Sequence, residues 1–421
     1  MIKIGILGVG TVGTSVAKIL EKNSDIIEAR AGKKIVATKG VVKNISKKRD
    51  INIKISNNPL DIIDDPQIDI VVELMGGVKE PYELVKKALK NGKAVVTANK
   101  ALLAYHRYEL QEIAGDLPLF YEASVAGGIP IIGAMRNGLS ANHIESITGI
   151  LNGTCNYILT KMIKEGVSYE EVLKEAQALG YAEADPTFDV GGYDAAHKLL
   201  ILASIAYGID AKPEDILIEG IENITQTDVE FAKEFGYEIK LLGIAKKREE
   251  GVELRVHPTM VKSSNPIAKV DGVMNAVGVV GDCVGQTMFY GPGAGGDATA
   301  SAVIADIIEI ARGNRGPMLG YKKGLEGERL KLLPIDNIES KYYLKLKVLD
   351  QPGVLAAVTS ELSKEKISIS SILQKDSKVQ DRVRLLLTTH TCNESDIIKA
   401  IGNLNRLDCV GDNVSFMRIE E

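Results

Sequence analysis

Cysteine is scarce in this sequence: the chain holds only four, and no two of them form a C-x-x-C pair. This argues against a disulfide framework and against a zinc ribbon, since both need closely spaced cysteines. We therefore expect a reducing, cytoplasmic location. Long apolar runs are missing too, because the longest, around Leu199 to Tyr207, is too short to span a bilayer. With no cleavage-site pattern at the N-terminus, we expect neither a targeting segment nor a membrane partner.

An excess of positive charge is also absent. Lysine and arginine number 51 and aspartate and glutamate 56, which gives a net charge of −5. No broad positive field is available to gather nucleic acid phosphates, so we expect no nucleic acid partner. Glycine, in contrast, is abundant: the chain has 41 glycines among 421 residues, against a usual share of about 7%. Such an excess indicates ligand sites lined by backbone.

The length is sufficient for several domains, and the patterns divide the chain into three folded units. In residues 1–136 short apolar runs alternate with helical patterns, as βαβ units do in an α/β, Rossmann-type, doubly wound parallel sheet. Residues 137–315 mix helical and strand-like stretches and predict an α+β domain. Glycine, proline and a charge run from Lys322 to Lys331 favour a linker over residues 316–336. A third unit follows in residues 337–421.

A glycine pattern, Gly8-Val-Gly10-Thr-Val-Gly13, follows the first predicted strand and opens a predicted helix. In that context G-x-G-x-x-G binds a dinucleotide: Gly8 permits the tight turn, Gly10 lets the backbone approach the pyrophosphate, and Gly13 lets the helix pack on the strand. Unpaired N–H groups at the helix start favour the anion. The alternative is a glycine turn that binds nothing. The predicted cofactor-binding residues here are Gly8, Gly10, Thr11, Val12 and Gly13.

The residue after the second predicted strand bears on the choice of cofactor. Sites selective for NAD place an acidic residue there to hold the ribose 2′-OH. In this sequence the strand runs into Lys43, and Lys47, Lys48 and Arg49 follow. A lysine in place of the acid favours a 2′-phosphate, so we expect NADP, with NAD as the alternative. The other interpretation of this lysine run is a solvated loop.

The stretch from Gly180 to Lys198 concentrates carboxylates just before an apolar helix. Asp194 and Lys198 are four residues apart and share one face if both are helical. A carbonyl that accepts hydride needs a proton donor for its oxygen, and a positioned lysine can supply that proton. On spacing alone, an ordinary surface pair is the favoured interpretation, because such pairs are common.

This stretch, Gly-Tyr-Ala-Glu-Ala-Asp-Pro with Asp189, Asp194 and Lys198, closely resembles the signature of homoserine dehydrogenase. The resemblance implies reversible NAD(P)H-dependent reduction of L-aspartate 4-semialdehyde to L-homoserine, in threonine, methionine and isoleucine biosynthesis. It also implies that residues 137–315 form the catalytic and dimerisation domain, with about 291–315 returning to complete the Rossmann domain. Four further segments match in order: Thr97-Ala-Asn-Lys100, Tyr121 to Pro130, Leu151 to Tyr157 and Gly291-Pro-Gly-Ala-Gly295.

The same resemblance implies roles for individual residues. Lys198 is expected to protonate the new alkoxide, and Asp194 to orient Lys198 and hold the substrate hydroxyl. Lys100 is expected as a second catalytic lysine near cofactor and substrate, and the two ammonium groups should depress each other's pKa. Glu183 would bind the substrate amino group. The remaining implied residues are Asp189 for substrate, Thr97, Lys100 and Gly295 for cofactor, and Glu122, Val125, Gly127 and Ile129 for a structural monovalent cation, sodium or potassium.

Two other functions remain open at this point. A phosphorylating semialdehyde dehydrogenase would combine a Rossmann domain with a cysteine nucleophile, for which Cys155 is the candidate. A non-catalytic amino-acid sensor could retain the dinucleotide fold alone. The segment around Cys155 matches the homoserine dehydrogenase pattern, in which no thiol reacts, and the intact Lys198, Asp194 and Glu183 favour an enzyme.

The third unit has a βαββαβ order and carries the turn Asp350-Gln-Pro-Gly353 after its first predicted strand. This pattern resembles an ACT domain, a small-ligand sensor of amino-acid-pathway enzymes. It implies an amino-acid effector near exposed polar residues of the second strand such as Ser368, Ser370 and Gln374, and we expect threonine, the end product of the pathway. The alternative is a module that only dimerises. Because such modules work in pairs, we expect a homodimer or homotetramer.

Overall fold

The amino-terminal part of the chain forms a fully parallel sheet. The computed structural model describes residues 1–323, 330–375 and 382–420. In this sheet the strand order is β3–β2–β1–β4–β5–β6, and the order reverses beside β1, as in a doubly wound dinucleotide-binding fold. The predicted Rossmann-type sheet is thus confirmed. Its strands are β1 (Ile2–Leu7), β2 (Ile35–Val41), β3 (Lys54–Ser56), β4 (Ile70–Glu73), β5 (Ala94–Thr97) and β6 (Leu119–Phe120).

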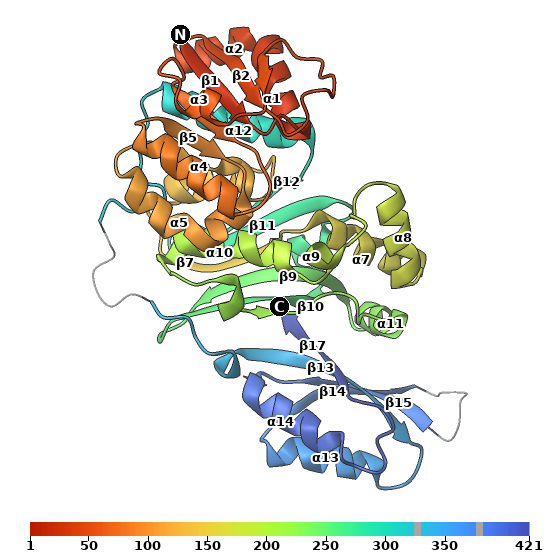
Figure 1. Ribbon diagram of the computed structural model, residues 1–421. Coiled ribbons are helices and arrows are strands. Elements are labelled where there is room, and N and C mark those ends of the chain that lie inside the picture. The colour runs from red at the N-terminus through yellow and green to blue at the C-terminus, as the bar shows by residue number, and fades with distance from the viewer. Residues whose placement is uncertain (324–329, 376–381, 421) are drawn as a thin grey trace.

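Helices cover both faces of this sheet, seen at the top of Figure 1. Side chains alternate along a strand, so Ile4 and Ile6 of β1 face one core with α1, α2 and α12, whereas Leu7 faces another with α3, α4 and α5. Helix α12 returns from far along the chain, and its Gly296 lies against α1. The helices are α1 (Thr11–Lys22), α2 (Ser24–Ala31), α3 (Leu60–Ile63), α4 (Lys79–Lys90), α5 (Lys100–Ala114) and α12 (Gly296–Ala311).

A second sheet lies below the first domain in the view of Figure 1. Its strands pair antiparallel in the order β12–β11–β7–β9–β10, and the short β8 runs parallel to β10. The strands are β7 (Ile144–Ile150), β8 (Leu217–Ile218), β9 (Tyr237–Lys247), β10 (Val252–Lys262), β11 (Met274–Gly281) and β12 (Gly285–Pro292). The helices of this region are α6 (Ile131–Gly133), α7 (Gly153–Glu165), α8 (Tyr169–Ala178), α9 (Thr187–Val190), α10 (Tyr193–Tyr207) and α11 (Gln226–Glu234).

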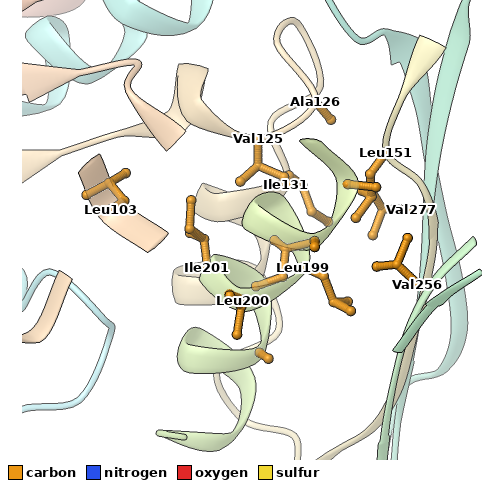
Figure 2. Packing of buried hydrophobic residues seen from close by; sticks show 14 of the residues in the cluster. Leu103, Val125, Ala126, Ile131, Leu151, Leu199, Leu200, Ile201, Val256 and Val277 are labelled. Carbon is orange, nitrogen blue, oxygen red and sulfur yellow. The ribbon is translucent and has the colours of Figure 1, made fainter. Parts of the chain in front are cut away.

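Helix α10 runs through the interior of the molecule. Nearly every residue from Asp194 to Tyr207 is buried, which fits a helix that is apolar on all sides. Figure 2 shows Leu103 of α5 on one side of this helix and Val256 and Val277 of the second sheet on the other. A charged side chain on such a helix needs a partner, because the surroundings offer no water.

The third unit has the predicted βαββαβ order, with one added short strand. Helices α13 and α14 pack on one face of its sheet, drawn blue in Figure 1. Its final strand, β17, pairs antiparallel with β13 and parallel with β10, so eleven strands form one sheet across both domains. The elements are β13 (Glu339–Leu349), α13 (Val354–Lys364), β14 (Ile369–Lys375), β15 (Arg382–Thr389), β16 (Cys392–Asn393), α14 (Glu394–Leu404) and β17 (Ser415–Glu420).

Both described ends of the predicted linker pack on the protein. Met318 and Leu319 are buried, and the Tyr121 hydroxyl donates to the Met318 carbonyl at 2.7 Å. Farther on, the Val252 N–H donates to the Lys331 carbonyl at 2.8 Å. The middle of the charge run, 324–329, lies outside the described residues. Within the described chain, no helix has both the length and the hydropathy needed to cross a membrane.

Candidate active site

Two lysines and one carboxylate meet where α5 approaches α10. The Lys198 ammonium donates to Asp194 Oδ2 and to the Leu151 carbonyl, both at 2.7 Å. Lys100, at the start of α5, places its Nζ 2.6 Å from Asp194 Oδ1. The predicted pairing of Asp194 with Lys198 is therefore present, but it is buried rather than a surface pair: the side chains are 3% and 11% exposed.

Burial and charge shift the pKa of each of these groups. Burial opposes ionisation of Asp194, yet the two ammonium groups hold its pKa below the usual range. Burial lowers the Lys198 pKa, and Lys100 adds to the lowering while Asp194 opposes it. Burial also acts to lower the Lys100 pKa, but Asp194, Asp189 and Glu183 outweigh it and raise it. The expected mutual depression is thus wrong for Lys100, because three carboxylates face it.

The local backbone explains how α10 presents these side chains. Gly192 precedes the helix with φ of +86°, and a Cβ there would lie 3.2 Å from the Glu219 carbonyl oxygen, so glycine suits this position. Asp194 then falls in the first turn, where the helix dipole favours a negative charge. Lys198 follows one turn later on the same face.

Two asparagines that the sequence analysis did not assign complete this cluster. Asn152 Nδ2 donates at 2.8 Å to both Asp189 Oδ1 and Asp194 Oδ2. Asn275 Nδ2 donates at 3.0 Å to the Leu151 carbonyl that also binds Lys198, and its Oδ1 is buried without a partner among the described residues. Asn152 belongs to a segment that matched the family pattern, which was the one available signal; Asn275 had none.

The two predicted substrate residues differ in position. Asp189 is half-buried, and burial with the nearby Asp194 raises its pKa. Glu183 is exposed, within electrostatic range of Lys100. Phe188 precedes Asp189 in α9, and its ring centre lies 5.6 Å from the Lys100 ammonium. The arrangement is a cationic centre rimmed by carboxylates, which suits a zwitterionic amino-acid substrate.

Cys155 does not have the environment of a nucleophile. It is fully buried, and burial together with Asp189 and Asp194 raises its pKa well above the ordinary thiol value. Its Sγ donates to the Asp189 carbonyl at 3.2 Å, and its N–H donates to Asn152. A thiol held protonated in this way attacks poorly, so the alternative function based on Cys155 is not supported.

The glycine loop has the geometry that a dinucleotide needs. Gly8 has φ of +97°, and a Cβ there would lie 2.5 Å from the Leu74 carbonyl oxygen; a Cβ at Gly13 would lie 2.4 Å from the Gly8 carbonyl oxygen. At Gly10 a Cβ would meet no protein atom within 4 Å, which leaves room for a ligand against the backbone. Thr11 and Val12 open α1 there, and Gly295, with φ of +127°, precedes α12 beside it. These residues fit a bound pyrophosphate.

A cavity of about 550 Å³ continues from this loop at the carboxyl ends of β1, β2 and β4. Lys43 and Arg49 supply its positive charge, and Glu80 also lines it. Arg49 is held in place because its guanidinium donates to the carbonyls of Val9, Asn44 and Lys47 at 2.8–3.1 Å. In the sequence, nothing distinguishes Arg49 from the neighbouring lysines as a residue that lines the cavity.

The side chain of Thr97, a predicted cofactor-binding residue, is buried inside the protein. It is fully buried, and its hydroxyl donates to Glu73 at 2.5 Å while accepting the Asn99 N–H at 3.0 Å. Its side chain is therefore committed to the protein, which leaves its backbone for a ligand. Burial raises the pKa of Glu73 to about 7, although hydrogen bonds from Thr97 and the Met75 N–H oppose the rise.

The predicted cation residues lie on one buried loop between the two domains. The Glu122 carboxylate is occupied, since it accepts the N–H groups of Ile132 at 2.8 Å and Gly133 at 2.6 Å. Ile129 offers a carbonyl that already accepts the Ile131 N–H. The carbonyls of Val125 and Gly127 accept no hydrogen bond from the described residues, so main-chain oxygens are the donors that remain for a hard cation.

Comparisons with known proteins agree with this geometry. Family models match three parts of the chain: "Homoserine dehydrogenase, NAD binding domain" over 8–116, "Homoserine dehydrogenase" over 130–308 and "ACT domain" over 342–409. A homoserine dehydrogenase of Helicobacter pylori is 54% identical over 419 residues, covering 100% of this chain and 99% of the relative. The chain belongs to the homoserine dehydrogenase family. Its reaction is the NAD(P)-dependent interconversion of L-aspartate 4-semialdehyde and L-homoserine, and the chain is an oxidoreductase.

Solved structures of homoserine dehydrogenases resemble the whole fold. One from Thiobacillus denitrificans has a TM-score of 0.95 at 45% identity and covers 100% of this chain and 98% of its own. A hyperthermophilic archaeal homoserine dehydrogenase, solved in complex with NADPH, has a TM-score of 0.63 at 30% identity and covers 73% of this chain and 97% of its own. The ACT resemblance of the third unit is confirmed. Because the whole chain belongs to a family of enzymes, a non-catalytic sensor is not supported.

Proposed function

We propose that Lys198 is the general acid that protonates the alkoxide during reduction and the base that deprotonates homoserine in the reverse direction. The observation that carries this assignment is the buried Lys198–Asp194–Lys100 cluster. Burial lowers the Lys198 pKa toward the range in which a lysine both gives and takes a proton. A nicotinamide bound on the glycine loop supplies or accepts the hydride.

The other residues of the cluster hold the geometry of that proton transfer. Asp194 orients the Lys198 ammonium and accepts the substrate hydroxyl proton in a hydrogen bond. Lys100, whose pKa is raised, stays protonated and stabilises the negative oxygen as it forms. Asp189 and Glu183 bind the substrate ammonium group, and the exposure of Glu183 leaves it accessible from solvent.

A homoserine oxidation assay tests the reaction in which Lys198 is proposed to act and distinguishes it from phosphate-dependent chemistry at Cys155. With homoserine and NADP in a phosphate-free buffer, absorbance of the reduced cofactor should rise, since Lys198 removes the hydroxyl proton and no thioester forms. Addition of inorganic phosphate should leave the rate unchanged. Reduced cofactor formed only from the semialdehyde, and only with phosphate, would instead support Cys155 chemistry.

We also propose NADP as the preferred cofactor. Lys43 and Arg49 line the cavity beyond the glycine loop, where the 2′-phosphate of a bound NADP would lie. The archaeal relative solved with NADPH supports the same preference. Glu80 lines the cavity as well and favours a hydroxyl, so the balance between the two cofactors rests on the cationic pair.

Lys43→Asp should shift the preference from NADP toward NAD. The substitution removes a partner of the 2′-phosphate and adds an acceptor for the 2′-hydroxyl, each a contact worth about 1–3 kcal/mol. The measurement is kcat/KM with each cofactor at fixed homoserine concentration. Lys47→Asp, in the same run but outside the cavity lining, is the matched control. An unchanged ratio in Lys43→Asp would place the phosphate elsewhere.

A monovalent cation, sodium or potassium, is proposed on the loop from Glu122 to Ile129. The free carbonyls of Val125 and Gly127 support it, together with the position of the loop between the two domains. A Cβ at Gly127 would lie 2.5 Å from the Gly293 carbonyl oxygen, so this loop contacts the segment that leads to Gly295. The cation would stiffen this junction rather than take part in proton transfer.

The ACT domain is proposed to bind threonine, and the chain to act as a homodimer or homotetramer in a reducing, cytoplasmic compartment. Ser368, just before β14, and Ser370 and Gln374 within it are exposed, and Gln374 Nε2 lies 3.5 Å from Asp350 of the Asp-Gln-Pro-Gly turn. All four thiols are free, as a reducing compartment requires.

Threonine should inhibit homoserine oxidation by the full-length enzyme. An effector acts by binding one arrangement of the protein more tightly, and a coupling of about 1–3 kcal/mol changes substrate affinity roughly 5- to 150-fold. Calorimetry on wild type and Ser370→Ala, with rates measured in parallel, locates the site. Loss of threonine binding without loss of basal rate in the variant supports the ACT site, whereas equal binding by both contradicts this location.

A further inference from the structure

A buried arginine joins the third unit to the catalytic domain. Arg418 of β17 is 2% exposed, and its guanidinium donates to both oxygens of Glu219, at 2.7 and 3.0 Å. Its Nε donates to Glu394, the first residue of α14, at 2.9 Å. Neither carboxylate belongs to the cluster around Lys198. A charge buried to this extent is costly unless it is paired, and here the two carboxylates supply the pairing.

Glu219 begins a short segment that contacts α9, the short helix that carries Asp189. Its own N–H donates to the Val256 carbonyl of β10 at 2.8 Å, and two residues later the Ile221 N–H donates to the Val190 carbonyl at 2.9 Å. At Gly220 a Cβ would lie 2.5 Å from that same Val190 oxygen, so no side chain separates the two backbones. The segment 219–221 is therefore held between β10 and α9.

Val190 immediately follows Asp189. Asp189 shares the Asn152 amide with Asp194, at 2.8 Å each. The Glu219 carbonyl oxygen also lies against Gly192, the N-cap residue of α10, where an added Cβ would be 3.2 Å from it. A shift of the segment 219–221 would thus reach Asp189 and the start of α10 through backbone contacts alone.

We propose that Arg418 is a positioning residue for the reaction. By holding Glu219 it fixes the segment 219–221, and through this segment it fixes α9 and the start of α10, which present Asp189 and Asp194 to the substrate. This rests on the proposed role of Asp189 in substrate binding. The third unit then contributes directly to the geometry of the site whether or not an effector is bound.

The variants Arg418→Met, Glu219→Gln and their combination test this assignment. Misplacing a binding group by about 1 Å can cost up to about 10²-fold, so we expect each single variant to lower kcat/KM for homoserine about 10-fold or more. The loss should appear mainly in the KM for homoserine, with the KM for NADP unchanged, since the glycine loop is remote. Because Arg418 is proposed to act on the site through Glu219, the double variant should lose no more than the larger of the two single losses, and Arg418→Lys should recover part of the loss.

Lys345→Met is the matched control. Lys345 makes another ion pair between the third unit and the catalytic domain, with its Nζ 2.8 Å from Asp228 on α11, but it does not contact the segment 219–221. It should change the melting temperature without changing the KM for homoserine. Glu219 is 40% exposed in its side chain, so Glu219→Gln carries the test if Arg418→Met fails to fold.

Two outcomes would overturn the proposal. Unchanged homoserine KM in both Arg418→Met and Glu219→Gln would make Arg418 an interface residue only. Additive losses in the double variant would show that Arg418 does not act through Glu219. Failure of the wild-type enzyme to oxidise homoserine is a separate result, which would contradict the assigned reaction rather than this coupling.

Discussion

Lys198→Ala should lower kcat for homoserine oxidation by about 10²- to 10⁴-fold, the range expected when a general acid–base group is lost. Among the described residues, the ammonium is the only group that contacts both Asp194 and the Leu151 carbonyl, so a water molecule in its place would be poorly oriented. Cofactor affinity should stay near the wild-type value, because Lys198 lies away from the glycine loop. Steady-state rates and a fluorescence titration with NADPH give both quantities.

Lys161→Ala is the control for this substitution. Lys161 on α7 also pairs with an acidic residue four positions along a helix, Glu165, but that pair is on the surface. It should leave kcat unchanged, since exposed pairs of this kind contribute well under about 1 kcal/mol. A Lys198→Ala enzyme with wild-type kcat and an unaltered pH profile would refute the proton-transfer assignment.

Asp194→Asn should produce the second largest loss, about 10²-fold or more in kcat. The amide keeps the shape but leaves two ammonium groups without their shared negative charge. Burial already lowers the Lys198 pKa and Asp194 opposes that effect, so removing the carboxylate lowers the pKa further. Since reduction needs Lys198 protonated, the pH at which the reduction rate falls should move to lower values.

The pH profiles of reduction by wild type and Asp194→Asn measure that shift directly. Asp185→Asn is a suitable control, because Asp185 lies in the same acidic stretch but bonds only to Thr187 among the described residues and is exposed. A profile that moves to higher pH in Asp194→Asn would contradict the sign of the argument. A loss of rate with no shift at all would limit Asp194 to holding substrate.

The sequence predicted the parallel sheet and the helical pairing of Asp194 with Lys198 because both depend on local periodicity. It could not predict that the pair is buried, since that depends on α5 and the second sheet enclosing α10. The raised pKa of Lys100 has the same origin: its three carboxylate neighbours come from segments more than 80 residues away, which no spacing rule connects.

The pairing of β17 with β10 was missed for a similar reason. An alternating strand pattern shows which face is buried, but both edges of a strand offer the same N–H and C=O groups. The sequence therefore predicts a separate third unit after a linker, with no strand paired across the two domains. The positions of Asn275 beside the Lys198 cluster and of Arg49 in the cavity could not be predicted either. A single polar residue in a strand, or one basic residue in a basic run, carries no signal until its neighbours in space are known.

The pairing of β17 with β10 also affects how the chain folds while it is being synthesised. Thr259 of β10 faces Arg418 of β17, so at about 5–20 residues per second β10 waits roughly 8–30 s on the ribosome for its neighbour. During that interval an open strand edge can pair with another nascent chain and aggregate. Lys246 of β9 and Arg255 of β10 form ion pairs with Glu420 of β17. Until β17 is synthesised these two cations lack that carboxylate, and a second copy brought to the same edge would meet them with cations of its own, so residues that pair inside the folded enzyme also oppose aggregation before folding is complete.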